Sequence, residues 1–117
     1  MKQFTIIREK WLRGDEDTSM LLDDTGCRCC LGSYLQACGL TDAQLQDRHV
    51  PADVRGGLPV EAQWLRRVIP IEGARQFTQD FHLMEVNDNE ALTDAEREAS
   101  ITKLFKEQGI EVLFVDA

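Results

Sequence analysis

The chain lacks several features that would point to a class of protein. No apolar run approaches the roughly 20 residues that a membrane span needs, so we expect no contact with a membrane. The first residues show neither a long apolar segment nor a small-residue cleavage site, which predicts a cytoplasmic protein with reduced thiols. A glycine-rich phosphate loop, a nucleophile-elbow serine and a dinucleotide fingerprint are also absent. We therefore expect that the protein is not an enzyme.

Basic residues are scarce. The chain has 13 Lys and Arg against 21 Asp and Glu, which gives a formal net charge of −8. This charge opposes binding to a phosphate backbone unless the bases gather on one face. The one local cluster, Arg66 and Arg67 with Arg75, is more typical of a solvated helix face than of a nucleic-acid footprint. We expect no direct binding to nucleic acid and favour a protein partner.

No internal repeat, linker or low-complexity tract divides the sequence. Its 117 residues and 13.3 kDa suit one compact domain and are too few for two independent cores. Hydrophobic residues make up 43% and charged residues 29%, as in an ordinary globular protein. We predict a single domain over residues 1–117.

Strand-forming segments lie near both ends of the chain. Residues 4–8 predict a first strand, and residues 110–115 predict a last strand that could pair with it. Residues 20–22 and 27–29 flank Asp-Asp-Thr-Gly, which favours a turn because aspartates stabilise turns and Gly26 can adopt a positive φ. These segments predict an N-terminal strand, a small β-hairpin and a C-terminal strand.

Helical signals fill much of the remainder. Apolar residues at i, i+3, i+4 and i+7 predict a helix over residues 31–38, which Gly39 would end. Thr41 and Gln44 form the pattern of a capping box before a second short helix. Thr93 and Glu96 form another, before a helix that runs to about residue 108.

The middle of the chain has mixed signals. Residues 49–58 predict a loop around at most one helical turn, because they contain a proline and a glycine pair. Pro59 could open a helix through Val68 that Pro70 closes, and residues 77–84 continue at helical spacing. Together these patterns predict an α+β fold with four or so short helices.

The cysteines gather at the junction of the predicted hairpin and the first helix: Cys27, Cys29, Cys30 and Cys38. Four thiolates could hold zinc, but the spacing Cys-x-Cys-Cys-x7-Cys lacks the paired two-residue spacings of zinc knuckles. Free cysteines also pack well as small apolar groups. As a third alternative, Cys29 or Cys30 at the helix N-terminus could be a thiolate nucleophile, with His49 or His82 as the base. A zinc-binding protein and a thiol-dependent enzyme therefore remain alternatives.

Several different short motifs are spread along the chain: Trp11-Leu12-Arg13-Gly14, Cys29-Cys30-Leu31-Gly32, Ala37-Cys38-Gly39, Asn87-Asp88, Glu96-Arg97-Glu98, Leu104-Phe105 and Gly109-Ile110-Glu111-Val112. This pattern resembles a group of small uncharacterised proteins of tailed bacteriophages and prophages, over most of the chain except residues 49–75. The resemblance implies a phage-encoded accessory protein in the cytoplasm of a bacterial host. It transfers no catalytic or binding residues.

We expect this accessory protein to act without a cofactor, by binding a bacterial or phage protein. Trp64 beside Arg66 and Arg67 is the first candidate anchor, because large aromatic side chains dominate interfaces. Trp11 and Tyr34 are further candidates. The alternative is that these aromatic side chains belong to the core.

Acidic residues supply the other candidate surface. Asp88, Glu90 and Asp94 could imitate the charge of a nucleic acid toward a basic, nucleic-acid-binding partner. Small size and acidity are analogous to those of inhibitors of host defence such as anti-CRISPR proteins, an analogy of size and charge only. The alternative is that the acidic residues only keep the protein soluble.

Overall fold

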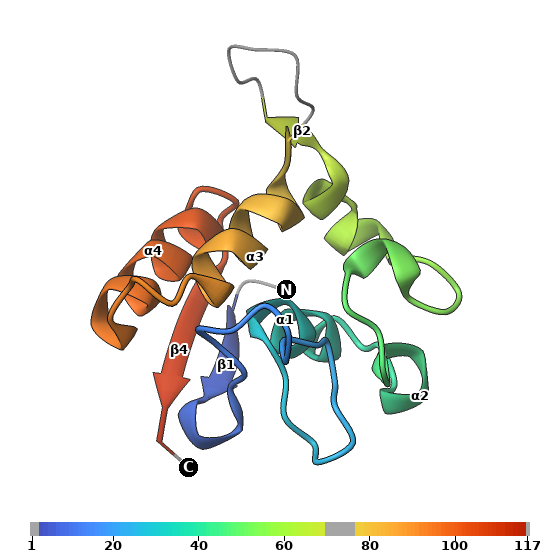
Figure 1. Ribbon diagram of the computed structural model, residues 1–117. Coiled ribbons are helices and arrows are strands. Elements are labelled where there is room, and N and C mark those ends of the chain that lie inside the picture. The colour runs from blue at the N-terminus through green and yellow to red at the C-terminus, as the bar shows by residue number, and fades with distance from the viewer. Residues whose placement is uncertain (1–2, 70–76, 117) are drawn as a thin grey trace.

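The computed structural model describes residues 3–69 and 77–116. Along the chain lie β1 (Gln3–Ile7), the 3-10 helix η1 (Arg8–Lys10), α1 (Cys30–Ala37), α2 (Asp42–Leu45), the 3-10 helices η2 (Pro51–Asp53) and η3 (Val60–Arg66), β2 (Val68–Ile69), β3 (Phe77–Thr78), α3 (Gln79–Asp88), α4 (Asp94–Lys106) and β4 (Glu111–Val115). The fold is α+β, as the sequence predicts (Figure 1). None of the helices in this part of the chain is long and apolar enough to cross a membrane.

The two ends of the chain meet in a parallel pair of strands. β1 pairs with β4 over five residues, from Gln3 beside Glu111 to Ile7 beside Val115. Phe4 and Ile6 face the core because side chains alternate between the two faces of a strand. The predicted pairing of the first and last strands is confirmed, and α1 and α4 pack against the pair.

The turn predicted at residues 23–26 forms. The Asp23 carboxylate accepts hydrogen bonds from the backbone N–H groups of Thr25 and Cys27, at 2.9 and 2.8 Å. Such an Asx turn satisfies backbone donors locally. The segment therefore reverses direction where the sequence predicts it.

The strands predicted on either side of that turn do not form a ladder with each other. Two backbone hydrogen bonds cross the turn, from the Asp23 N–H to the Cys27 carbonyl and from the Cys29 N–H to the Met20 carbonyl, at 2.9 and 2.8 Å. The β-bridges of these flanks are made with other segments, Leu22 with Gln46 and Arg28 with Trp11. The antiparallel strands of the fold are β2 and β3, which pair further along the chain. The position predicted for the hairpin is corrected accordingly.

Helix α1 confirms the helix predicted over residues 31–38. Gly39 follows it with a φ of +99°, the left-handed conformation that the predicted cap requires. Gly32 lies against the backbone of Leu21, and a Cβ atom there would come within 1.9 Å of the Leu21 carbonyl oxygen. The loop before α1 can approach the helix this closely only because residue 32 is glycine.

Both predicted capping boxes are present. In α2, the Thr41 hydroxyl accepts from the Gln44 N–H while the Gln44 side chain accepts from the Thr41 N–H, at 3.3 and 2.9 Å. In α4, Thr93 and Glu96 make the same reciprocal pair at 3.1 and 2.9 Å. These helix starts depend on neighbouring residues alone, so the sequence predicts them well.

The predictions for the middle of the chain hold in part. Residues 49–58 contain the single helical turn η2, as expected. A helix does follow Pro59, but η3 is a 3-10 helix and ends at Arg66, while Val68 belongs to β2. Phe77 lies in β3, so the helical repeat predicted from that residue begins only in α3. Pro70 lies outside the described residues.

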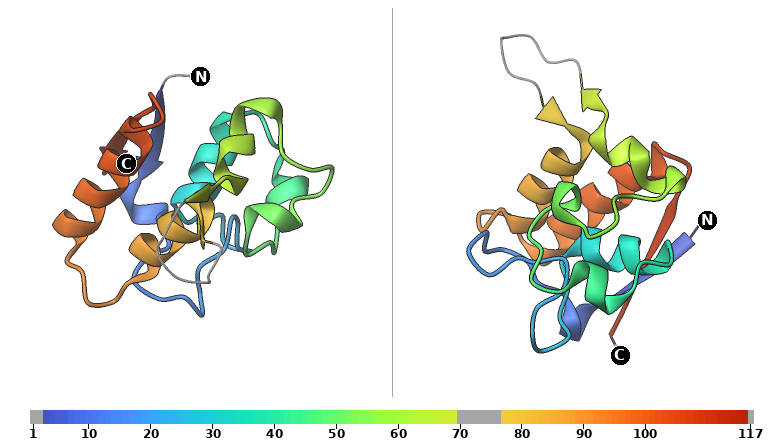
Figure 2. Two further views of the ribbon diagram at one scale, coloured as in Figure 1. Left: turned by 90° about the horizontal axis from the view of Figure 1, so that it is seen from above. Right: turned by 90° about the vertical axis from the view of Figure 1, so that its right-hand side faces the viewer.

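Helix α3 occupies the centre of the arrangement. It packs against α4, α1 and η3. Seen from above, α4 and the β1–β4 pair lie on one side of the molecule and the segment from α2 to η3 lies on the other, with α3 between them (Figure 2). Segments from distant parts of the sequence therefore meet at this helix.

Candidate functional site

An open cleft of about 720 Å³ lies beside α3. One wall comes from α3 between Phe81 and Asp88, and the others come from residues 16–19, the start of α1 and His49. Glu16 and Asp17 of this wall are exposed. The cleft thus joins four parts of the chain that are far apart in sequence.

The cleft is acidic. Four carboxylates line it, from Glu16, Asp17, Glu85 and Asp88, and no lysine or arginine of the described residues does so. Concave surfaces lined by charge of one sign concentrate ions of the opposite sign. This arrangement can attract a cationic group.

An aromatic ring accompanies the carboxylates. Phe81 lines the cleft and is 50% exposed, the most exposed aromatic side chain in the described part of the chain. Guanidinium and ammonium groups bind to aromatic faces as well as to carboxylates. A Lys or Arg side chain would therefore find both kinds of contact here.

The floor of the cleft is organised by Asn87, whose side chain is fully buried. Its amide oxygen accepts hydrogen bonds from the indole N–H of Trp11 and the backbone N–H of Cys30, at 2.8 and 3.1 Å. Its amide nitrogen donates to the carbonyl of Leu12 and the carboxylate of Asp88, at 2.9 and 2.8 Å. One side chain therefore joins α3 to the N-terminal segment and to the start of α1.

Asp88 differs from the other acids of the cleft because it is half-buried and bonded to Asn87. Burial raises the pKa of its carboxyl above the ordinary value, and the hydrogen bond from Asn87 opposes that shift. A cationic group bound next to it would favour the charged form.

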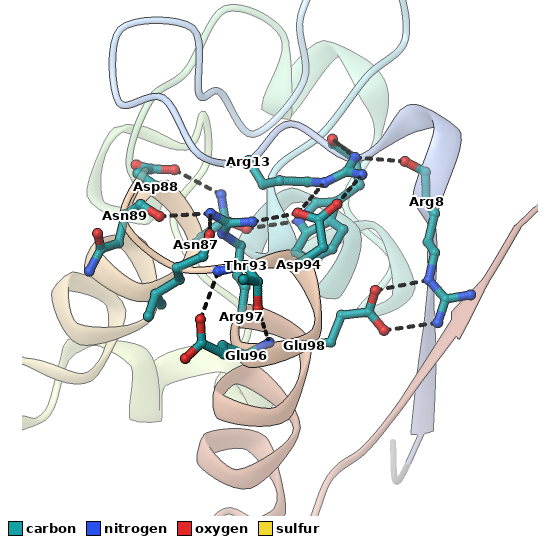
Figure 3. Close-up of polar contacts among 12 residues, drawn as sticks. Arg8, Arg13, Asn87, Asp88, Asn89, Thr93, Asp94, Glu96, Arg97 and Glu98 are labelled. Atoms are coloured by element: carbon teal, nitrogen blue, oxygen red, sulfur yellow. Dashed lines mark hydrogen bonds and ion pairs between the residues drawn. The ribbon is translucent and has the colours of Figure 1, made fainter.

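A buried arginine holds the chain just beyond α3. The Arg97 guanidinium donates to the carbonyls of Asn89 and Leu92, at 2.7 and 2.9 Å, and to the carboxylate of Asp94 (Figure 3). Arg13 pairs with the other side of Asp94 at 2.9 Å. Asp94 is therefore bound to two arginines of the same chain, which lowers the pKa of its carboxyl.

The acids predicted to form one surface are thus separated by the fold. Asp88 lies in the cleft, and Glu90 is exposed just after α3. Asp94 is engaged in the ion pairs with Arg13 and Arg97 and does not line the cleft. Only part of the predicted acidic surface contributes to this site.

The aromatic anchors predicted from the sequence lie in the core. Trp64, Trp11 and Tyr34 are 7%, 4% and 1% exposed. The Trp64 indole donates to the Tyr34 hydroxyl at 2.9 Å, and that hydroxyl donates to the carbonyl of Glu61 at 3.0 Å. The rings of Tyr34 and Trp64 both pack against Phe105, and Trp11 packs against Phe114, so the alternative interpretation, a core role, is correct.

The arginines predicted to form a basic cluster have different environments in the structure. Arg66 forms an ion pair at 2.8 Å with Asp80, a nearly fully buried carboxylate at the start of α3, and so joins η3 to that helix. Arg67 is exposed, and its carbonyl accepts from the Gln79 N–H. Arg75 lies outside the described residues.

Sequence reasoning missed Glu16, Asp17, Glu85 and Phe81 as parts of one site. The acidic run at residues 15–17 is visible in the sequence, but nothing local indicates that it lies beside residues 85–88. A contact between segments so far apart depends on the whole fold.

Two cysteine thiols lie at the cleft but are buried. Cys29 and Cys30 are 3% and 0% exposed. Burial raises the pKa of Cys29 to about 11 and that of Cys30 well above its ordinary value. The helix N-terminus was expected to favour a thiolate, and desolvation outweighs it.

The structure does bring His49 and His82 to the same cleft as these thiols. The Nδ1 atom of His49 lies 3.2 Å from the Ser19 carbonyl. Because burial keeps the thiols protonated, the thiolate that a cysteine nucleophile needs is disfavoured. A thiol-dependent enzyme stays an untested prediction whose physical basis is weakened.

The four cysteines are all free thiols. In residues 3–69 and 77–116, no group of three or more His, Cys, Asp or Glu side chains is placed to hold a metal ion. The zinc alternative, with Cys27, Cys29, Cys30 and Cys38 as ligands, stays a prediction that awaits a metal analysis.

Replacing Asn87 with alanine should destabilise the protein by about 3–4 kcal/mol, because it leaves the Trp11 indole and the Cys30 amide buried without partners. Urea unfolding followed by circular dichroism measures this cost. Asn89→Ala is the matched control, since it removes one exposed hydrogen bond and should cost less than about 1 kcal/mol. Equal effects of the two substitutions would contradict the role given to Asn87.

Thiol alkylation of the native protein should proceed in the order Cys27, then Cys38, with Cys29 and Cys30 slower by about tenfold or more. Cys27 and Cys38 are half-buried, and partial burial raises the pKa of Cys38 to about 11. Peptide mass spectrometry after timed labelling gives the order, with the unfolded protein as the reference. Fastest labelling at Cys29 or Cys30 would restore the nucleophile hypothesis.

No protein-family model, no curated protein and no solved structure matches this chain. The resemblance to small phage and prophage proteins stays a prediction that these comparisons do not test.

Proposed function

We propose that the protein is a non-enzymatic binding protein that captures a basic protein partner through the cleft beside α3. The observation that carries this proposal is the concentration of four carboxylates there, with no lysine or arginine of the described residues among the lining side chains. Opposite charge on the partner would speed encounter and select against acidic competitors.

The contents of the cleft favour a Lys or Arg side chain of a protein as the group that enters it. Glu16, Asp17 and Glu85 lie around an opening that also contains the exposed Phe81 ring. A guanidinium group can pair with a carboxylate and stack on an aromatic ring at once. Asp88 is half-buried and already accepts a hydrogen bond from Asn87, and a bound cationic group would give its carboxylate a partner of opposite charge.

The biological setting extends this proposal. We infer a phage or prophage accessory protein that works in the bacterial cytoplasm, and we favour a nucleic-acid-binding protein as its partner. Such partners carry a basic surface, which an acidic cleft on a chain of net charge −8 would complement. Inhibition of a host defence protein by charge mimicry is one action of this kind.

The test reverses the charge of the exposed cleft acids with the triple substitution Glu16→Lys, Asp17→Lys and Glu85→Lys. Tagged protein should capture one basic partner from a bacterial lysate under reducing conditions, and the triple variant should capture it at least about tenfold less. Capture by the unchanged protein should also weaken as salt is added, since salt screens exposed charges.

The control substitutes Asp24, Asp53 and Glu111 with lysine. These exposed acids do not line the cleft, and the change in net charge is the same. The proposal expects normal capture by the control. Equal loss in both triple variants would assign the effect to overall charge, and equal capture by all three proteins would overturn the role of the cleft.

A further inference from the structure

A second hollow lies on the other side of α3. It measures about 330 Å³ and is lined by residues of β2, α3 and α4. The apolar side chains of Ile69, Val86 and Leu104 line it together with the polar side chains of Gln79, His82 and Ser100, and its charged residues, Lys103 and Glu107, are of opposite sign. Because its charges balance and apolar side chains contribute to its lining, this groove suits an uncharged side chain with an apolar part, in contrast to the acidic cleft.

The cleft and the groove share two lining residues. His82 and Val86 of α3 belong to both. Glu85, on the same helix, is exposed and lines only the acidic cleft. The outer side of α3 is thus a ridge with an acidic hollow on one side and an apolar hollow on the other.

We propose that an extended segment of the basic partner crosses α3, with a Lys or Arg side chain in the acidic cleft and an apolar side chain in the groove. This inference rests on the proposed function and specifies the chemistry of the partner. It predicts that the protein recognises two particular residues of the partner, one basic and one apolar, and not a diffuse basic surface.

The width of α3 sets the spacing between these two residues. A helix with its side chains is about 10–12 Å across. Side chains on one face of an extended chain lie about 9 Å apart at three residues in a polyproline conformation, or about 13 Å apart at four residues in a strand. Residues three or four apart on a helix are only about 5–6 Å apart, so a helical segment would not span the ridge.

Selection from a displayed library of random peptides, with the unchanged protein as bait, tests this directly. The enriched peptides should contain Lys or Arg with an apolar residue three or four positions away. Enrichment of basic residues without this apolar position would overturn the inference and leave the proposed function standing. No enrichment of basic residues, or no selected peptide, would overturn both.

Two variants separate the two hollows. Ser100→Phe should fill the groove, so selection on it should retain the basic residue and lose the apolar one. Ala99→Phe is the matched control, because Ala99 is exposed on the same helix and does not line the groove. If Ser100→Phe fails to fold, Lys103→Trp fills the groove from an exposed position. An unchanged apolar preference in the folded groove variant would overturn the inference.

Discussion

The buried amide of Asn87 is the interaction on which the site depends. A buried polar group is costly unless its hydrogen bonds are made, and Asn87 has good partners for both its oxygen and its nitrogen. Its partners come from the N-terminal segment and from the start of α1, neither of which is near residue 87 in sequence. An aspartate could not donate to the Leu12 carbonyl, and a leucine could satisfy none of these groups.

Two groups of acidic residues have distinct environments in the fold. Some are bound to cations of the same chain: Asp80 to Arg66, Asp94 to Arg13 and Arg97, and Glu98 to Arg8. These ion pairs connect helices with one another and with the N-terminal segment. The acids of the cleft form the second group, in which carboxylates gather without a lysine or arginine among the lining residues of the described chain. A count of charges in the sequence cannot distinguish the two groups.

What the sequence could predict follows from the range of the interactions. Capping at Thr41 and Thr93 and the end of α1 at Gly39 depend on adjacent residues, and all three were predicted correctly. The pairing of the end strands was predicted because both are short β-rich segments. The prediction of paired strands around residues 23–26 was wrong, because Leu22 and Arg28 form their β-bridges with distant segments that the local pattern does not reveal.

The candidate site was harder to predict for the same reason. Of the predicted interaction residues, Asp88 lies in the cleft, while Trp64 is in the core. A tryptophan beside two arginines has the same local pattern at an interface and in a core, and only tertiary packing separates the two. Likewise, the proximity of residues 16–17 to Glu85 depends on the loop being held by the network around Asn87.

The most direct measurement of the central claim is a titration of ¹⁵N-labelled protein with a short arginine-rich peptide, followed by amide chemical shifts. We expect saturable shifts concentrated at residues 16–17, at His49 and along residues 81–89, with little change on the exposed face of β1 and β4. Shifts spread evenly over the acidic surface, or confined to another face, would contradict the claim that the cleft beside α3 is the cation-binding site.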